Sequence, residues 1–450
     1  MATKTSPPLR LRRLNAPAID RSLFARRRRR LFSSLGDGIL ILPTAPHPLR
    51  NADTHYPFRP GSDFHYLTGF PEPEAVLVAS PGRTTLFVLP RDREREIWDG
   101  RRWGVEGARR AFGADAAFPV AELWQRLPEL LQGHARVFAT LGRDRRFDAR
   151  LLEAQRHLAT KQRRSNPPAH LALVDPLPAL AELRRRKDAA EIALLTRAAE
   201  ITGQGHLAAM RGARPGMREY EVQALVESEF RRGGARRNGY ESIVAGGANA
   251  CVLHYVENAG RLRAGDLLLI DAGAEYGDYT ADVTRTFPVS GTFSGPQRAA
   301  YEIVLRAQLA AIAAARPGVP WNRPHAVALR ELTRGLVALG VLRGRVAKLV
   351  AKSAYKPWYM HGTSHWLGRD VHDVGAYQDQ RGRPVRLEAG NVLTVEPGLY
   401  FAPDDRRVPK PLRGIGIRIE DDVLITSSGA RVLTRAIPKS VAELEAVCGR

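Results

Sequence analysis

The 450-residue chain has few cysteines and no long apolar segment. Cys251 and Cys448 are far apart and stand in no repeated spacing. This argues against a disulfide framework and excludes a zinc site built from several thiolates, so we expect a cytoplasmic protein. No stretch reaches the ~18 consecutive apolar residues of a transmembrane helix, and the start lacks the pattern of a secretory signal. We therefore expect no association with a membrane.

Acidic residues are scarce relative to basic ones. Lys and Arg number 69 against 47 Asp and Glu, which gives a formal net charge of +22. Arginine is spread along the whole chain, with one dense run from Arg26 to Arg30. A polyanion-binding surface and an organelle transit peptide are alternatives for this basic start. We favour a solvated helix face and do not expect nucleic acid as a partner.

The order of periodic segments predicts three regions. Residues 1–17 are polar and basic, which predicts a flexible tail. Residues 18–175 mix short apolar runs with helical patterns and indicate an α/β domain. Four prolines between Lys161 and Pro178 predict a linker, which places the boundary near Asp175. Residues 176–450 predict an α+β domain with helices beside a largely antiparallel sheet, including one strand over 415–426.

Two aspartates lie on neighbouring predicted strands in the segment LLLIDAGAEYGDYTADVTRTF, residues 267–287. An apolar strand ends in Asp271, a glycine-rich turn follows, and the next strand carries Asp282. Two buried carboxylates on the same side of such a hairpin need a compensating cation. The alternative is a pair of turn aspartates on the surface.

Three histidines lie close together in the segment HGTSHWLGRDVHD, at positions His361, His365 and His372. Histidine binds metals and carries protons near neutral pH. One isolated histidine is more often structural, but three flanked by glycines indicate a functional site. The spacing differs from that of the zinc helix HExxH, because residue 362 is glycine.

Two glutamates follow apolar strands further along the chain. Glu396 closes the strand in NVLTVEPGLY, where a buried glutamate needs a partner. In GIGIRIEDD, strand alternation places Arg418 and Glu420 on one face, so that the arginine can orient the carboxylate. A solvated ion pair is the alternative for that second segment.

The four segments together offer four carboxylates and at least one imidazole. This oxygen-rich set suits Mn²⁺, or Co²⁺ or Zn²⁺ in vitro, better than a metal that prefers thiolates. Four negative charges exceed what one divalent cation compensates, so we expect two metal ions. Paired metals about 3.5–4 Å apart with a bridging hydroxide are a usual device for hydrolysis.

These motifs, in this order, resemble those of the pita-bread metallopeptidases, which include methionine aminopeptidase, aminopeptidase P and prolidase. Within this family the sequence is similar to the bacterial aminopeptidases P of the M24B group, over most of its length. The likeness includes the N-terminal domain, which methionine aminopeptidases lack, and the segments RNADTHYPFRPGSDFHYLTGFPEPEAVLV, REIWDGRRWG, LHYVEN and DVTRTFPV. It implies a C-terminal pita-bread fold after a creatinase-like α/β domain.

The resemblance implies a role for each candidate metal ligand. Asp271 would bind one metal with both oxygens, and Asp282 and Glu420 would bridge the pair. His365 and Glu396 would complete the coordination of the second metal. Glu396 also matches the carboxylate that takes a proton from the attacking water.

The resemblance also assigns residues around the metals. His254, in LHYVEN, matches a histidine that contacts the substrate near the scissile bond. His361 and His372 match histidines that line the pocket and stabilise the tetrahedral intermediate or move protons. Arg418 matches an arginine near the metals, and Asp53 a carboxylate that pairs with it.

The implied substrates are peptides with an N-terminal Xaa-Pro sequence, from which the first residue is removed. Tyr400 lies at a matching active-site position. Trp98 matches an aromatic residue that a neighbouring subunit contributes to the pocket in the family's oligomers. A homodimer or homotetramer is therefore expected.

Three relatives provide alternatives. Prolidase, an Xaa-Pro dipeptidase, shares all five ligands, so the metal site does not separate it from an aminopeptidase. Some pita-bread proteins are non-catalytic binders, among them histone-chaperone subunits and RNA-associated proteins, but these have lost ligands. Creatinase also lacks the metal ligands, all of which this sequence contains.

Overall fold

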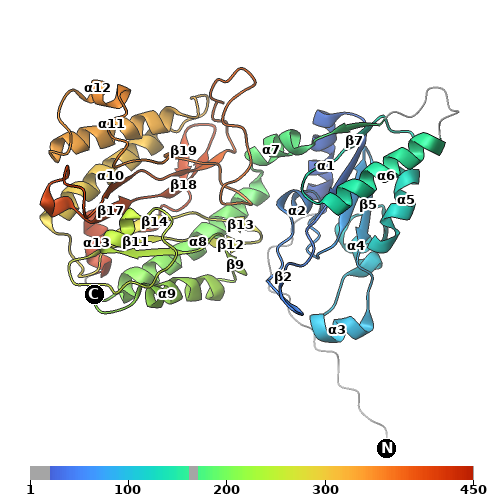
Figure 1. The fold of residues 1–450 in the computed structure, drawn as a ribbon, viewed down its shortest axis with the longest axis horizontal. Coiled ribbons are helices and arrows are strands. Elements are labelled where there is room, and N and C mark those ends of the chain that lie inside the picture. Colours follow the sequence, from blue (N-terminus) through green and yellow to red (C-terminus); the bar gives the residue numbers. More distant parts are fainter. Residues whose placement is uncertain (1–20, 162–170, 449–450) are drawn as a thin grey trace, which may run out of the picture. The chain divides into compact units, whose positions relative to one another are not determined.

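The computed structural model describes residues 21–161 and 171–448. The predicted flexible tail, residues 1–17, lies outside these ranges. The chain forms two compact units, Ile19–Arg184 and Arg185–Arg450 (Figure 1).

A six-stranded mixed sheet is the centre of the N-terminal unit. Its inner strand β1 pairs antiparallel with β4 and parallel with β7. Leu40 and Leu42 of β1 face one hydrophobic cluster, whereas Ile39 and Ile41 face another. Because both faces are covered, the strand is apolar throughout and shows no polar alternation. The spatial order is β6 (Ala116–Pro119), β5 (Arg83–Val88), β4 (Val76–Ser80), β1 (Ile39–Pro43), β7 (Arg136–Phe138) and β8 (Ala172–Val174).

Helices pack on both faces of this sheet and give the α/β layers that the sequence predicts. Helix α1 buries Leu31 and Phe32 in one cluster, and α5 and α6 bury Leu127 and Leu151 in the other. The elements outside the sheet are α1 (Arg21–Leu35), β2 (Leu49–Asn51), β3 (Thr54–His55), α2 (Ser62–Thr68), α3 (Arg93–Asp99), α4 (Gly104–Phe112), α5 (Leu123–Leu130) and α6 (Arg145–Lys161).

The arginine run on α1 is only partly solvated. Arg27 and Arg28 are 3% and 8% exposed. They donate to the carbonyls of Tyr66 and Leu67 at 3.2 and 2.7 Å, and Arg27 also lies over the Tyr66 ring. Both carbonyls belong to the last turn of α2, where a helix has no further N–H groups to pair them. The predicted solvated face is therefore wrong for these two arginines.

Helix α7 (Leu177–Arg185) determines where the first unit ends. Leu180 is fully buried in the same cluster as Leu31, so this helix packs with the N-terminal unit. The units divide between Arg184 and Arg185, further along the chain than the expected position near Asp175. Within the predicted linker, β8 joins the sheet as an edge strand beside β7. Residues 162–170 of that linker lie outside the described ranges.

Long helices flank small antiparallel sheets in the C-terminal unit, as predicted. Helix α8 begins at a capping box, in which the Asp188 and Glu191 side chains each accept from the other residue's backbone N–H. Among the described residues, no helix combines the length and apolar character needed to cross a membrane. The helices are α8 (Ala189–Gly212), α9 (Glu219–Arg232), α10 (Gly295–Ala314), α11 (Arg323–Ala338), α12 (Val346–Ala351) and α13 (Val441–Cys448).

The strands of this unit form several sheets, in which all neighbouring strands are antiparallel. One sheet contains β10 (Ile243–Gly246), β11 (Leu267–Asp271) and β14 (Thr284–Pro288). A second contains β15 (Val392–Val395), β18 (Asp421–Ile425) and β19 (Ala430–Val432). The others pair β16 (Gly398–Phe401) with β17 (Ile415–Arg418), and β12 (Ala274–Tyr276) with β13 (Tyr279–Thr280) and β9 (Arg237–Asn238).

The segment 415–426 forms two strands in different sheets, so the predicted single strand is wrong. Strand β17 pairs with β16, whereas β18 pairs with β15. At the break, the Glu420 N–H donates to the carbonyl of Thr284 on β14. The strands that pair with these two, β15 and β16, are likewise separated after Glu396, because Pro397 has no N–H with which to continue a ladder. Both glutamates thus stand where the chain passes from one sheet to the next.

Candidate metal centre

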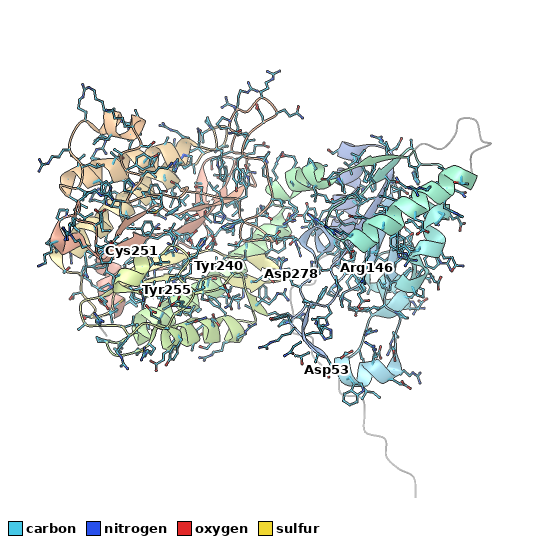
Figure 2. All side chains as sticks on the ribbon, viewed as in Figure 1. Asp53, Arg146, Tyr240, Cys251, Tyr255 and Asp278 are labelled. Carbon is cyan, nitrogen blue, oxygen red and sulfur yellow. The ribbon has the colours of Figure 1, made fainter. Side chains whose placement is uncertain are left out.

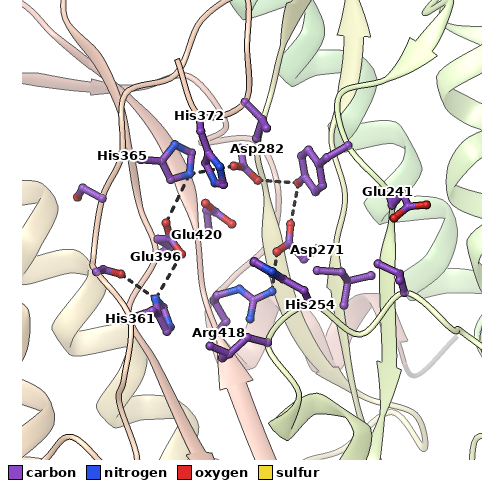
Figure 3. A pocket seen from close by; sticks show the side chains of 17 residues that line it. Glu241, His254, Asp271, Asp282, His361, His365, His372, Glu396, Arg418 and Glu420 are labelled. Carbon is purple, nitrogen blue, oxygen red and sulfur yellow. Dashed lines mark hydrogen bonds and ion pairs between the residues drawn. The ribbon is translucent and has the colours of Figure 1, made fainter. Parts of the chain in front are cut away.

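A pocket of about 460 Å³ in the C-terminal unit brings together side chains from β11, from the segment before β14, from the histidine segment, and from the ends of β15 and β17 (Figure 3). Residues separated by more than a hundred positions in sequence meet there. The lining includes nine of the predicted site residues: His254, Asp271, Asp282, His361, His365, His372, Glu396, Arg418 and Glu420.

Three of these residues form a compact cluster of ligand atoms. Asp282, His365 and Glu420 each offer one atom, and these atoms lie within 4.8 Å of one another. His365 Nε2 is 3.2 Å from Asp282 Oδ2 and 3.5 Å from Glu396 Oε1. Oε1 of Glu420 is buried and has no hydrogen-bond partner among the described residues. A buried oxygen of this kind, beside an imidazole and a second carboxylate, suits a cation.

Both carboxylate oxygens of Asp271 form hydrogen bonds. Its Oδ2 accepts from Arg418 at 2.5 Å, and its Oδ1 lies 2.7 Å from the hydroxyl of Tyr240. The same hydroxyl is 2.6 Å from Asp282 Oδ1. A hydroxyl carries a single proton, so Tyr240 donates to one of the two aspartates at a time. Tyr240 is not among the predicted site residues, since a lone tyrosine after Asn-Gly resembles an ordinary turn residue.

Thr284 connects the arginine to the last glutamate. Its hydroxyl donates to Glu420 Oε2 at 2.6 Å and accepts from Arg418 Nε at 3.0 Å. Arg418 and Glu420 thus face the same pocket, as strand alternation predicts, although the strand breaks between them. Thr284 is fully buried, and only its position two residues after Asp282 could have suggested a role.

Burial and mutual repulsion make the carboxylates reluctant to ionise. Burial, reinforced by Asp282 and opposed by Arg418, raises the pKa of Asp271. Burial also raises the pKa of Glu396 to about 7, despite the attraction of His365. Burial and then the charges of its carboxylate neighbours raise the pKa of Glu420 well above its usual range. A bound divalent cation removes this cost. The donor set therefore fits metal ions.

The pKa of His365 is raised as well, but in a histidine a raised pKa favours the charged form. Burial disfavours its protonated ring, but the hydrogen bond and charge of Asp282 outweigh that effect and raise its pKa to about 9. Its Nδ1 is 3.0 Å from the carbonyl of Trp366, which leaves Nε2 directed at the carboxylates. A metal ion held by His365 would take the place of the proton on Nε2.

The other two predicted motif histidines lie on either side of the carboxylates (Figure 3). His361 Nε2 is 2.8 Å from the Tyr400 hydroxyl, which in turn accepts from Arg418 at 3.2 Å. Burial, together with the charge of Arg418, lowers the pKa of His361 to about 3, so this ring is neutral at pH 7. His372 packs edge to face on His365, with ring centroids 4.4 Å apart.

Asp53 and Trp98 belong to the N-terminal unit. Asp53 is exposed in the turn between β2 and β3 (Figure 2), and its pairing with Arg418 stays a prediction. Trp98 lies on α3 with 87% of its surface exposed. Its contribution to a neighbouring subunit's pocket also stays a prediction.

Comparison with known proteins places this centre in a family. Residues 193–427, more than half of the chain, match metallopeptidase family M24. The Xaa-Pro aminopeptidase of Escherichia coli strain K12 is 45% identical over 435 residues, which cover 95% of this chain and 98% of that protein. The chain belongs to metallopeptidase family M24.

The N-terminal unit of this M24 metallopeptidase also has a known counterpart. Residues 24–138 match the N-terminal domain of aminopeptidase P. The aminopeptidase PepP of Pseudomonas aeruginosa is 48% identical with a TM-score of 0.92, covering 96% of this chain and 98% of that one. A zinc-substituted aminopeptidase P of E. coli in complex with product is 44% identical, also with a TM-score of 0.92, covering 96% and 99%. These likenesses confirm the predicted pita-bread domain and its α/β companion.

Proposed function

We propose that this protein is an Xaa-Pro aminopeptidase, which hydrolyses the bond between the first residue of a peptide and a proline in the second position. The observation that carries the proposal is the convergence of five ligand-type side chains in one pocket. The 45% identity to an Xaa-Pro aminopeptidase over 95% of the chain supports the choice within the family.

Asp271, Asp282, His365, Glu396 and Glu420 would hold two divalent cations. When bound, such cations polarise the scissile carbonyl and make a water molecule acidic enough to be a nucleophile at neutral pH. We propose Mn²⁺ as the native metal because four carboxylates and one imidazole form a hard, oxygen-rich set, with Co²⁺ or Zn²⁺ able to replace it in vitro.

The remaining pocket residues position the substrate and move protons. Glu396 takes the proton of the attacking water and returns it to the proline nitrogen that leaves. His254, His361 and His372 surround the scissile bond, where imidazole N–H groups stabilise charge that develops on the carbonyl oxygen. Arg418 and Tyr400 hold Asp271 and His361 in place through the hydrogen bonds described above.

A homodimer or homotetramer is part of the proposal. The whole of α3 is described, and none of its residues is buried within the chain. Ile97 and Trp98 are 82% and 87% exposed side by side on this helix. Large exposed apolar side chains on a short helix are typical of an interface.

The free thiols of Cys251 and Cys448 are consistent with a reducing cytoplasm.

A substrate comparison tests the proposal. The Mn²⁺-loaded protein is incubated with an Xaa-Pro dipeptide and with a longer peptide that begins Xaa-Pro-Xaa, and the released first residue is measured. We expect release from the longer peptide. Cleavage confined to the dipeptide would instead identify a prolidase, and failure to cleave either peptide would refute the assignment.

A further inference from the structure

The carboxylate of Glu219 has an unusual number of partners for a residue outside the metal centre. Glu219 begins helix α9 and is 1% exposed. Its Oε1 accepts from the Gly246 N–H at 2.7 Å and from Asn249 Nδ2 at 2.9 Å. Its Oε2 accepts from the Tyr255 hydroxyl at 2.8 Å and from the Gly260 N–H at 2.6 Å. Four donors thus match the four lone-pair positions of an ionised carboxylate.

All four donors come from one connection, residues 246–260, which we name the His254 loop. Tyr255 and Cys251 mark it in Figure 2. Three residues near its middle, Leu253, His254 and Val256, line the pocket of the metal centre. Glu219 therefore binds both ends of this loop and also Tyr255, which lies between the pocket-lining residues His254 and Val256.

Asn258 is a second anchor at the end of the loop, and one of its hydrogen bonds goes to the same helix. Asn258 is 2% exposed and adopts a left-handed conformation, with φ of 48°, which asparagine tolerates better than most residues. Its side chain accepts from the Val244 N–H at 2.9 Å and donates to the carbonyl of Ser242 at 2.8 Å. It also donates to Gln223 of α9 at 2.9 Å.

In the middle of the loop Tyr255 packs half-buried against the cluster of Ile243, Ala245, Ala250 and Leu269, but its neighbours are more exposed. Val252 and Val256 are 55% and 44% exposed, and His254 is exposed. Segments with few buried apolar contacts depend on other interactions for their order. The backbone at Gly260 approaches the carboxylate so closely that a Cβ there would come within 2.8 Å of Glu219 Oε2. Glycine is needed there to let the N–H reach the oxygen.

We propose that Glu219 is a positioning residue for the reaction, which acts by fixing the His254 loop so that His254 reaches the substrate. The catalytic part of this inference rests on the proposed function. Glu219 contributes through geometry alone and has no contact with the pocket. Its effect on turnover therefore passes through His254.

The variant that tests this is Glu219→Gln. An amide keeps one acceptor oxygen, but its NH₂ group accepts no hydrogen bond, so in either orientation of the amide one backbone N–H, that of Gly246 or that of Gly260, loses its partner. We expect kcat/KM on an Xaa-Pro-Xaa peptide to fall about ten- to a hundredfold, the scale of an ångström-sized misplacement. Metal content, measured by elemental analysis, should stay at the wild-type level.

A matched control and a milder variant separate this effect from general damage. Glu221→Gln makes the same chemical change two residues further along α9. The Glu221 side chain is exposed and accepts from the Arg218 N–H. It should leave kcat/KM within about twofold of wild type, as surface changes usually do. Tyr255→Phe removes one of the four donors and should give a smaller loss in the same direction as Glu219→Gln.

A double-mutant cycle with His254→Ala decides whether the effect passes through His254. If it does, Glu219→Gln costs little further activity once His254 is absent. Hydrogen–deuterium exchange of residues 246–260 gives a readout independent of turnover, and should be faster in Glu219→Gln but unchanged in Glu221→Gln. Additive losses in the cycle, or unchanged exchange, would overturn the inference. A wild-type protein that cleaves no Xaa-Pro peptide would overturn the proposed function and the catalytic part with it, whereas exchange would still test the anchoring.

Discussion

Glu420 and Asp421 are neighbours in the chain and are both buried, yet their surroundings are opposite. Glu420 points into the pocket, where it faces the carboxylates of Asp271, Asp282 and Glu396. Asp421 points away from it and accepts from Arg285 at 2.8 Å, Thr434 at 2.7 Å, Gln308 at 2.6 Å and Lys439 at 2.5 Å. We name the first group the ligand cluster and the second, Asp421 with its four donors, the inner cluster.

The electrostatics of the two clusters differ accordingly. Burial alone would raise the pKa of Asp421, but Arg285 and Lys439 outweigh it and hold that pKa at about 2. Burial and like charges raise the pKa of Glu420 instead. In the inner cluster the chain supplies its own cations. In the ligand cluster Arg418 and His365 face four carboxylates, so part of the compensating charge has to come from outside the chain, which supports the proposed metal site.

The largest expected effect comes from Glu420→Gln, which keeps the shape of the side chain and removes one charge and one ligand atom. Hydrolysis of an Xaa-Pro-Xaa peptide should fall about 10³-fold or more, because catalytic metal ions contribute several kcal/mol to the transition state. Bound metal should fall in parallel. The exposed Glu302→Gln on α10 serves as a control. Full metal content and turnover in Glu420→Gln would remove Glu420 from the site.

Asp421→Asn tests the inner cluster. Arg285 is fully buried and would lose its counter-charge, which costs about 3–5 kcal/mol when one partner of a buried ion pair is removed. We expect a large drop in the thermal unfolding midpoint, measured by calorimetry at saturating Mn²⁺. The folded fraction should still bind metal, because the ligand set is intact. Loss of metal without loss of stability would reverse the assignment of the two clusters.

The contributions of the two clusters to stability should change in opposite directions with pH. The folded-state pKa of Glu396, about 7, lies above its ordinary value of 4.5. Its contribution to stability is therefore present below pH 4.5 and is lost as the pH rises through about 7. The metal-free protein loses this contribution between about pH 4.5 and about pH 7, whereas Mn²⁺ binds better at the higher pH because fewer protons compete.

Thermal unfolding in EDTA and in Mn²⁺ at both pH values measures that difference. The gap between the two midpoints should widen as the pH rises, and a constant gap would contradict the prediction. Asp421 behaves in the opposite sense. The stabilisation that Asp421 contributes is present above pH 3.8, the ordinary pKa of an aspartate. It is lost only as the pH falls towards the folded-state pKa of about 2.

The smallest expected effect is that of Thr434→Val. The hydroxyl donates to Asp421 at 2.7 Å and accepts from the Asp422 N–H at 3.2 Å. Loss of a hydrogen bond to a buried charge costs about 1.5–3 kcal/mol, so the unfolding midpoint should fall less than in Asp421→Asn. Turnover at a temperature where the variant is folded should match wild type. A turnover loss as large as that of Glu420→Gln would show that the two clusters are coupled.

Much of the ligand cluster could be predicted because each of its carboxylates lies on a predicted strand or at the end of one. Asp271 and Glu396 both end such strands, and Arg418 and Glu420 share a face by alternation. Tyr240 and Thr284 could not be predicted in the same way, since each becomes a partner of the carboxylates only when distant strands meet. Glu219 resembled an ordinary acidic residue at a helix start, a position that acidic side chains favour on any helix.

The sequence by itself determined the residue types of the metal centre, the order of the motifs and the helices and strands on which most of them lie. These depend on local periodicity, which acts over a few residues. Only the tertiary structure decided that the strand over 415–426 breaks at Glu420, that Arg27 and Arg28 are buried, and that Asp421 receives cations while Glu420 does not. Each of these depends on partners far away in the chain, because a buried charge is stabilised by whatever neighbours the fold places beside it.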